Sequence, residues 1–539
     1  MRPNRLAAAG VLLATGVGLL ATAAVAAGTH PASRVKDGGT LRLNVSSTDV
    51  QSIDPAIDYE FIGWQLEYAT CLKLMNYPDR AGHAGNVLQP EAAAGYPVVS
   101  EDGRTFTFRI RSGLRFNTGE PVTAATFAGV FNRNLNPKLQ SPAVSFMGDV
   151  KGAQAVMRGK AKTASGVVAK GNRLSVTLVA AAPDFLARAA MPFFCAVPLN
   201  TPVPLTGNSL ASAGPYYIAS RTPNRQILLQ RNPNYHGPRP HHVDTMTVTV
   251  NTNSNQSLLQ IRANEADYDM YGLPSPASSQ LAKQYGINKS RFFVHDSNAI
   301  NYIAINTRRV SDLSMRRAIN YAIDRPAMVR QAGVLAGEPT DQFLPPTLRG
   351  YRNADIYPLN APNLAKAKAL MNGRTTKMVL YSPNDPFAQS QDQVIVANLK
   401  AIGIAVTPKP LSFSALLAAI GDPKEPYDLA LLGWLADYPD PVDFLNAKLS
   451  GTQITPTNNP NVSLVNDPAL NRQLARAALL SGPRRYSTYG SLDIDIMRTV
   501  APWVPLFVPT VREFVSSHVG CYLFQEAQAA MDLAHVCLK

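Results

Sequence analysis

The sequence predicts a mixed α/β protein with more than one lobe. Stretches in which apolar and polar residues alternate, such as 105–110 and 245–250, indicate strands. Other stretches repeat apolar residues at helical spacing, and one of these lies between two strand-like stretches, which is the order of a βαβ unit. The chain has 539 residues, more than one hydrophobic core normally supports. Because no low-complexity linker interrupts it, we expect α/β lobes joined by short segments.

The N-terminus has the three parts of a secretory signal peptide. Arg2 and Arg5 precede an apolar stretch over residues 6–25, which ends among small alanine residues. We therefore expect a signal peptide over residues 1–27, cleaved after Ala26 or Ala27, and an exported protein. The apolar stretch is also long enough to span a bilayer, so an uncleaved anchor is the alternative.

Strands and helices follow one another along the rest of the chain. Residues 174–178 alternate like the strands above, and a helix is expected from Ser314, which is available as its N-cap. A second helix begins at Asp385-Pro386 and ends before Gly403, with Pro in the first turn and Gly at the end. Strands over 378–381 and 404–406 flank this second helix, and together they form the predicted βαβ unit.

The segment that follows the apolar run 427–432 is the first candidate site. It reads Gly433-Trp434-Leu435-Ala436-Asp437-Tyr438-Pro439-Asp440-Pro441. Ligands of open α/β sheets bind at the ends of strands, so an acid at this place in a basic protein is a candidate for binding a cationic group. The alternative is a turn, in which Asp and Pro are both common.

The charge of the chain argues against a nucleic-acid partner. The formal net charge of +14 becomes +12 when Arg2 and Arg5 are removed with the signal peptide. The basic residues are scattered, with no run longer than pairs such as Arg484-Arg485. A nucleic-acid-binding protein would be expected to cluster them. We expect an anionic envelope surface as the neighbour instead.

Four cysteines, an even number, permit disulfide bonds in an exported chain. Their spacing fits neither a CxxC redox pair nor a zinc site, so structural bridges are expected. The sequence allows three connectivities. Cys521 and Cys537 flank a short segment and are the favoured pair, which leaves Cys71 with Cys195. No cysteine lies near the expected cleavage site, so the usual lipoprotein attachment point is absent.

Signatures of catalysis are missing from the sequence. There is no G-x-S-x-G elbow, H-E-x-x-H motif or Walker A motif. One S-x-x-K match, at residues 33–36, lies in the N-terminal tail without a K-T-G partner. The adjacent pair His241-His242 follows a proline and is expected in a solvated loop. We therefore expect a binding protein with no catalytic residues, no metal site and no cofactor.

An ordered set of short motifs carries a resemblance to a known family. The motifs are Gly38-Gly39-Thr40-Leu41, Ser52-Ile53-Asp54-Pro55, the stretches 106–116 and 120–124, Ala213-Gly214-Pro215-Tyr216, Arg231-Asn232-Pro233-Asn234-Tyr235, the stretches 301–307, 317–325 and 433–437, and Ala501-Pro502-Trp503-Val504-Pro505-Leu506. In this order they resemble family 5 of the extracellular solute-binding proteins of ABC importers, which includes oligopeptide-, dipeptide- and nickel-binding proteins. Two departures are His236, where Trp is common, and the absent lipid-modified cysteine.

The resemblance implies a two-lobed fold of the periplasmic-binding-protein type (type II), with an extra subdomain inserted in lobe I. After a tail over 28–35, lobe I would comprise residues 36–300 and 500–539, with the inserted subdomain at about 85–203. Lobe II would comprise 301–499. The chain would cross between the lobes near 298–303 and 498–501, and closure about these hinges would sequester a ligand.

The resemblance also implies a function and a site. The protein would capture di- or oligopeptides and deliver them to the membrane permease of an ABC importer, acting as a monomer. Gly433 and Leu435 would pair with the peptide backbone, and Asp437 would accept its α-ammonium group. Trp434 would be either a pocket wall or a core residue. The facing segment 57–61 would contribute Tyr59 as a wall, with Asp58 beside it.

Two alternatives remain open at this point. The same binding role could serve a nickel chelate, an opine or a sugar, because relatives with other ligands can keep a similar motif. An exported hydrolase of the same shape is the other alternative, and the missing nucleophile argues against it.

Overall fold

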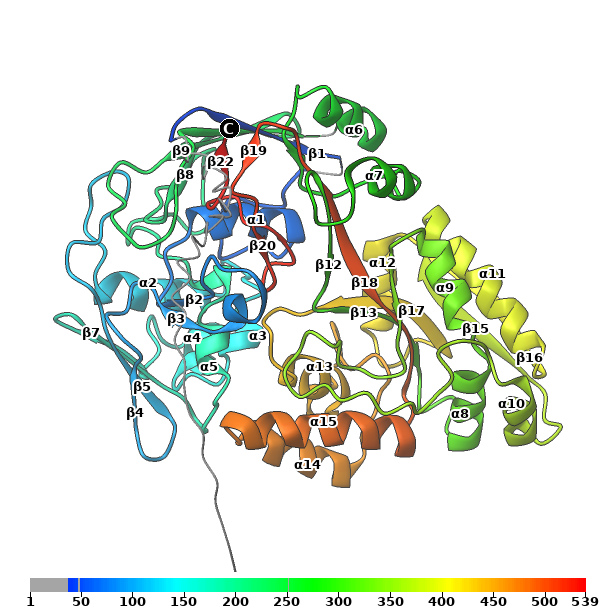
Figure 1. Cartoon of the computed structure of the whole chain (residues 1–539). Coiled ribbons are helices and arrows are strands. Elements are labelled where there is room, and N and C mark those ends of the chain that lie inside the picture. The colour runs from blue at the N-terminus through cyan, green and yellow to red at the C-terminus, as the bar shows by residue number, and fades with distance from the viewer. Residues whose placement is uncertain (1–36, 47–48, 251) are drawn as a thin grey trace, which may run out of the picture. The chain divides into compact units, whose positions relative to one another are not determined.

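The computed structural model of the chain describes residues 37–46, 49–250 and 252–539 (Figure 1). The expected signal peptide over 1–27 and the tail over 28–35 lie outside the described residues. Within the described part, no helix combines the length and the apolar character needed to cross a membrane.

The N-terminal part of the described chain contains two sheets. A five-stranded sheet has the order β11-β1-β10-β9-β8, and a four-stranded antiparallel sheet has the order β4-β5-β7-β6. The strands of the first are β1 (Thr40–Val45), β8 (Tyr216–Thr222), β9 (Gln226–Arg231), β10 (Thr245–Val250) and β11 (Tyr268–Asp269); those of the second are β4 (Val98–Val99), β5 (Thr105–Arg109), β6 (Val167–Lys170) and β7 (Arg173–Thr177).

Helices pack against each of these sheets. Helix α1 (Phe61–Thr70) shares a core with the five-stranded sheet, and α2 (Ala124–Asn134) shares one with β5 and β7. The other helices of this part are α3 (Val144–Met147), α4 (Ala153–Met157), α5 (Phe185–Arg188), α6 (Ser254–Arg262) and α7 (Ala277–Tyr285).

A seven-stranded sheet forms the centre of the C-terminal part. Its order is β12-β18-β13-β17-β15-β16, and β14 pairs with β18. The strands are β12 (Phe292–Asp296), β13 (Ala299–Ile305), β14 (Gly337–Pro339), β15 (Thr376–Pro383), β16 (Ile404–Leu411), β17 (Leu429–Leu435) and β18 (Trp503–Phe514).

Both faces of this sheet are covered by helices (Figure 1). One face packs on α8 (Leu313–Ala322), α9 (Arg325–Ala332), α10 (Leu364–Met371) and α11 (Pro386–Lys400). The other packs on α12 (Phe413–Ile420), α13 (Val442–Leu449), α14 (Pro468–Ala478) and α15 (Gly482–Thr499). A strand covered on both faces needs apolar residues at every position, which explains the uninterrupted apolar run that begins β17.

The long strand β18 connects the sheets. Its first half pairs with β13 in the seven-stranded sheet, its second half pairs with β12, and Val515 just beyond it bridges Tyr268 of the five-stranded sheet. Short hairpins complete the fold: β2 (Met75–Asn76) with β3 (Gln89–Pro90), β19 (Val519–Gly520) with β22 (Cys537–Leu538), and β20 (Phe524–Gln525) with β21 (Ala530–Met531).

The predicted elements are confirmed, with one cap misassigned. The stretches 105–110, 174–178 and 245–250 are the strands β5, β7 and β10, and β15, α11 and β16 form the predicted βαβ unit with parallel strands. Asp385 caps α11 by accepting from the Ala388 N–H. The N-cap of α8, however, is Asp312, whose carboxylate accepts from the N–H of Ser314. The prediction of Ser314 was wrong because the stronger acceptor lies two residues earlier.

Two disulfide bonds join Cys71 to Cys195 and Cys521 to Cys537, which is the favoured pairing. The first bridge closes a loop with a sequence separation of 124 and the second a loop of only 16. Cross-links stabilise mainly by restricting the unfolded chain, and a longer loop is restricted more.

We therefore expect both bridges to stabilise the protein, and the Cys71–Cys195 bridge to contribute more. Replacing either pair with alanine should lower the free energy of unfolding by about 2–4 kcal/mol, with the larger loss for Cys71→Ala/Cys195→Ala. Urea unfolding of the two double variants measures this. Four free thiols in protein from an oxidising compartment would contradict the pairing itself.

A buried carboxyl group in α15 should make stability depend on pH. Asp493 has no exposed surface, and burial raises its pKa to about 7, although the Phe343 N–H and the Gln342 side chain donate to it. In the unfolded chain an aspartate has a pKa of about 3.9. The folded protein therefore holds the proton more tightly, and stability falls as pH rises from the unfolded pKa to the folded pKa.

We expect Asp493→Asn to remove this dependence. Between about pH 5 and pH 8 the wild type should lose about 2–3 kcal/mol more of its unfolding free energy than the variant. Denaturant titrations of both proteins at the two pH values measure the difference. Parallel pH profiles would mean that Asp493 titrates as it does in the unfolded chain.

Candidate functional site

Strand β17 emerges from the core at its C-terminal end. Its first four residues are buried, with Leu429 and Leu431 in the core under α8–α11 and Ala430 and Leu432 in the core under α12–α15. After them Gly433 is exposed, Trp434 is half-buried, and Leu435 has 37% of its surface exposed.

The exposed end of β17 has one side without a strand partner. Strand β13 pairs with β17 along its whole length, from Leu429 opposite Ile305 to Leu435 opposite Ala299. On the other side, β15 pairs only with Leu429 and Ala430. Among the described residues, no strand pairs with 431–435 on that side. An open strand edge of this kind can take an extended segment as an added strand.

Asp437 follows the strand directly and is bonded to Tyr59. The Ala436 N–H donates to the Asn298 carbonyl oxygen, which continues the pairing up to the acid. Asp437 is 9% exposed, and its Oδ1 accepts a hydrogen bond of 2.6 Å from the Tyr59 hydroxyl. Tyr59 lies between β1 and α1, and it is 39% exposed. Two of the predicted site residues, distant in sequence, are thus in contact.

Helix α13 adds an acid and a base that sequence reasoning missed. Asp443 Oδ2 accepts from the backbone N–H of Asp437 at 3.0 Å and from Trp434 Nε1 at 3.2 Å. Lys448 Nζ lies 2.9 Å from the centroid of the Trp434 ring. Both new residues are nearly buried, with 2% and 8% exposure. Trp434 therefore packs against the core, and its ring also contacts two charged side chains. Its Nε1 donates to Asp443, and the face of the ring lies against Lys448.

The electrostatics of this cluster favour an added positive charge. Burial raises the pKa of Asp437, against the lowering effects of the Tyr59 hydroxyl and Lys448. Burial and the charge of Asp437 hold the pKa of Asp443 well above its usual range, and burial lowers the pKa of Lys448 to about 8. Raised acid pKa values show that the charged carboxylates lack compensation, so a cation placed here would be stabilised.

The structure turns Asp58 away from this cluster. Asp58 has no exposed surface, and its carboxyl group lies so close to Gly63 of α1 that a Cβ atom there would be 1.6 Å from Oδ2. Its backbone oxygen accepts from Trp64 Nε1, and its backbone N–H donates to the Asp54 carbonyl oxygen. With its side chain packed against α1, Asp58 does not join the cluster around Asp437, and its role as a ligand contact stays a prediction. Tyr59 instead presents a ring packed among aromatic side chains, Trp64, Phe146 and Phe193.

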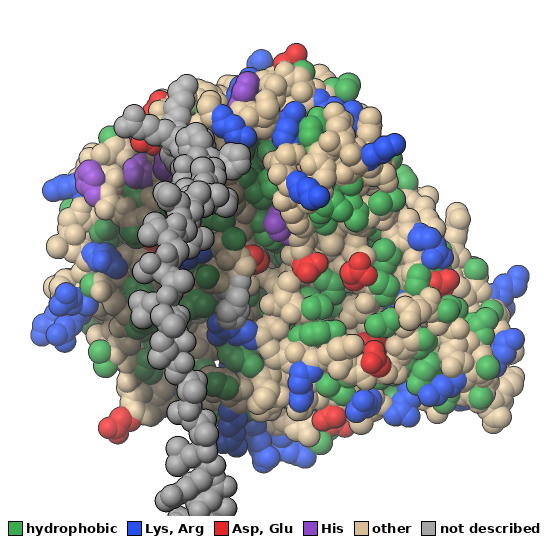
Figure 2. All heavy atoms as spheres, in the orientation of Figure 1, with side chains coloured by type: hydrophobic (Ala, Val, Ile, Leu, Met, Phe, Trp, Pro, Cys, Tyr) green, Lys and Arg blue, Asp and Glu red, His purple; other side chains and the backbone are tan. Residues whose placement is uncertain are grey.

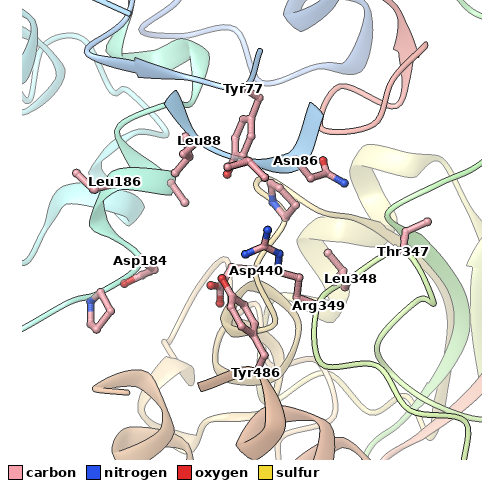
Figure 3. Close-up of a pocket in the computed structure, with 14 residues that line it drawn as sticks. Tyr77, Asn86, Leu88, Asp184, Leu186, Thr347, Leu348, Arg349, Asp440 and Tyr486 are labelled. Carbon is pink, nitrogen blue, oxygen red and sulfur yellow. The ribbon is translucent and has the colours of Figure 1, made fainter. Parts of the chain in front are cut away.

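A pocket of about 250 Å³ lies beside the segment that follows Asp437. Pro439 and Asp440 line it on one side, and residues of the segments 77–88, 183–187 and 347–349 line the others. The Arg349 guanidinium points into its middle, between the rings of Tyr77 and Tyr486 (Figure 3). A guanidinium group and two aromatic rings therefore line the pocket, with Arg349 over the ring of Tyr486.

The two acids of this pocket have partners of their own. Asp440 binds Arg485 through both oxygens, at 2.7 and 3.0 Å. Asp184 accepts from the Tyr438 hydroxyl and forms an ion pair with Arg188. Among the described residues, no group of His, Cys, Asp and Glu is arranged to hold a metal ion. A ring nitrogen of His241 is bonded to the Arg239 carbonyl oxygen and its ring packs on Tyr235, and a ring nitrogen of His242 is bonded to Asp37.

The chain matches a family model over residues 87–456, which is described as the bacterial extracellular solute-binding proteins, family 5. The match covers more than half of the chain. The chain belongs to this family. Its fold is accordingly the two-lobed, mixed α/β fold of the family 5 solute-binding proteins, as the resemblance implied.

Three comparisons illustrate the range of the family. The chain is 25% identical to the periplasmic oligopeptide-binding protein OppA of Salmonella typhimurium, over 96% of this chain and 95% of that one. It is 24% identical to the probable deoxycholate-binding periplasmic protein YgiS of Escherichia coli (strain K12), over 82% and 84%. Among solved structures, clavulanic acid biosynthesis oligopeptide binding protein 2 superposes with a TM-score of 0.86 at 24% identity, covering 93% of this chain and 96% of that one.

Within this family 5 fold, the predicted site residues divide into two groups. Asp437, Gly433, Trp434, Leu435 and Tyr59 lie together at the end of β17, and Asp58 does not join them. Asp443, Lys448 and Arg349 were missed. Asp443 and Lys448 form no recognisable sequence motif, because an acid and a base are common on any helix. The only sequence signal for them was the position of their helix, α13, just after the Asp437 motif.

Proposed function

We propose that this family 5 protein is the substrate-binding component of an ABC importer and that its ligand is a peptide. The observation that carries the proposal is the open edge of β17 ending at a buried carboxylate. A strand edge pairs with any peptide backbone, and an acid at its end fixes where the peptide begins. A ligand without an extended backbone would use only one of these features.

The surroundings of the strand end support a peptide with a free amino group. Asp437 lies in a cluster with more acids than bases, so an α-ammonium group would be stabilised there. Tyr59 is half-exposed beside it and can cover the first residues of the ligand. Arg349 lines the neighbouring pocket, where its guanidinium lies over the ring of Tyr486.

We further propose the lobe arrangement and partners that the sequence predicts. Lobe I comprises 36–300 and 500–539, with the inserted subdomain at about 85–203, and lobe II comprises 301–499. The protein acts outside the cytoplasmic membrane as a monomer, presents the closed form to a permease, and catalyses no reaction. Basic and acidic side chains are interspersed over the face drawn in Figure 2, which agrees with a partner other than nucleic acid.

We expect the lobes to close on the ligand, with hinges near 298–303 and 498–501. Small-angle X-ray scattering with saturating tri-alanine should give a smaller radius of gyration than the ligand-free protein, because ligand held between lobes favours the closed state. An unchanged radius would contradict the hinge assignment.

Calorimetry tests the function. Protein stripped of bound ligand by unfolding and refolding should bind tri-alanine, and it should bind N-acetyl-tri-alanine much more weakly. A nickel chelate, a monosaccharide and an opine serve as competing classes. Tight binding of one of these with none of tri-alanine would overturn the peptide proposal, and cleavage of the peptide during incubation would instead support the hydrolase alternative.

A further inference from the structure

Counted over the side chains of the protein alone, the charges at the end of β17 do not balance. Asp437, Asp443 and Lys448 are each at least nine-tenths buried, so the cluster has two carboxyl groups for one ammonium group. A buried charge without a partner costs several kcal/mol, and a group in that position commonly takes up a proton instead. The cluster therefore requires either a proton or a second cation.

Hydrogen bonding within the cluster indicates where such a proton lies. Asp443 Oδ2 accepts from the backbone N–H of Asp437 at 3.0 Å and from Trp434 Nε1 at 3.2 Å, which holds the two acids beside each other. Two buried carboxylates at one site repel each other, so a proton taken up by the cluster goes to one of them.

The other titratable groups that face the pair do not supply the missing charge. Tyr59 donates its hydroxyl proton to Asp437 Oδ1 as a neutral phenol, and burial and the acid raise its pKa. Burial likewise holds the pKa of Tyr438, which faces Asp443, well above its usual range. Lys448, with a pKa of about 8, supplies one positive charge at mildly acidic pH.

We propose that the free protein holds one proton between Asp437 and Asp443 and that the ammonium group of the ligand displaces it to the solvent. This inference rests on the proposed function. Before binding, the cluster contains two carboxyl groups, one proton and the Lys448 ammonium, and it is neutral. After binding, two carboxylates face two ammonium groups, and it is neutral again. Asp443 is thus a positioning residue: its negative charge makes a positively charged ligand group necessary for a neutral cluster.

Proton release can be counted by calorimetry with tri-alanine at about pH 6, where the peptide amino group, with a pKa of about 7.7–8.0, is fully protonated. Titrations in two buffers of different ionisation enthalpy should give a release of about one proton per peptide for the wild type. The affinity should then rise by up to about tenfold per pH unit between about pH 5 and 6.5.

Two variants make the measurement specific. Asp443→Asn removes the partner that shares the proton, so it should release almost none, bind more weakly and show a flat pH profile. Asp493→Asn removes another buried carboxyl group with a raised pKa, which faces Gln342 and Phe343 instead of this cluster, and it should release as many protons as the wild type. Binding without proton release by the wild type, or equal release by Asp443→Asn, would overturn the inference and leave the peptide proposal intact.

A ligand-free measurement separates the two proposals completely. The infrared difference spectrum between free wild type and Asp443→Asn at about pH 6 should contain the carbonyl band of a protonated carboxylic acid. A missing band would overturn the shared proton whether or not tri-alanine binds. A band in a protein that fails to bind tri-alanine would support the proton and reject the peptide.

Discussion

Asp437→Asn should weaken the binding of tri-alanine by about 2–5 kcal/mol, roughly thirtyfold to several thousandfold, because it removes one partner of a buried charged pair. Folding should be nearly unaffected. Burial raises the pKa of Asp437, so the charged form of this side chain destabilises the folded protein. The amide oxygen of Asn can still accept the hydrogen bond from the Tyr59 hydroxyl. Calorimetry for binding and urea unfolding for stability measure the two effects separately.

Two comparisons decide whether the charge of Asp437 is responsible. N-acetyl-tri-alanine, which lacks the ammonium group, should bind the wild type about as weakly as tri-alanine binds Asp437→Asn. Asp422 is a turn residue whose carboxylate accepts from the Lys424 N–H, and Asp422→Asn should bind tri-alanine normally. If Asp437→Asn also binds normally, Asp437 is only a turn residue, which is the alternative that its sequence context allows.

The local sequence was sufficient to predict those helices and strands whose signals lie within a few neighbouring residues. The alternation in 245–250 identifies β10 because side chains of a strand point to opposite faces, and Pro and Asp at the start of α11 satisfy its first turn. The apolar run in β17 likewise predicted a buried strand whose next residues reach the surface. The place of Asp437 at the end of a strand therefore follows from the residues that precede it.

The remainder of the site depends on contacts between distant parts of the chain. Tyr59 reaches Asp437 only because the segment before α1 lies against the end of β17, and Arg349 reaches its pocket from a different segment again. Asp58 and Tyr59 are neighbours that point in opposite ways, one against Gly63 and the other toward Asp437. Which neighbour faces a ligand is decided by backbone direction, which their residue types do not reveal.

The same limit applies to the pair Arg484-Arg485, which the sequence presents as two equivalent basic residues. Arg484 is exposed, whereas Arg485 is 3% exposed and binds Asp440 through both carboxylate oxygens. Arg485 also donates to the carbonyl oxygens of Ala478 and Leu480, at the end of α14. Asp440 thus has a structural role, although it lies only three residues from the acid proposed to bind ligand.

Arg485→Met should therefore lower the free energy of unfolding by about 3–5 kcal/mol, because it leaves the Asp440 carboxylate buried without its partner and removes donors from the end of α14. Burial raises the pKa of Asp440 even with Arg485 present, so the acid can take up a proton once the arginine is gone, and the loss should shrink as pH falls toward about 4. Arg484→Met is the matched control and should change stability by no more than about 0.5 kcal/mol. Urea unfolding of both variants at neutral and acidic pH measures these effects. Equal stability of the two variants would mean that the Asp440–Arg485 pair contributes nothing, and that the segment carrying Asp437 is held in place by other contacts.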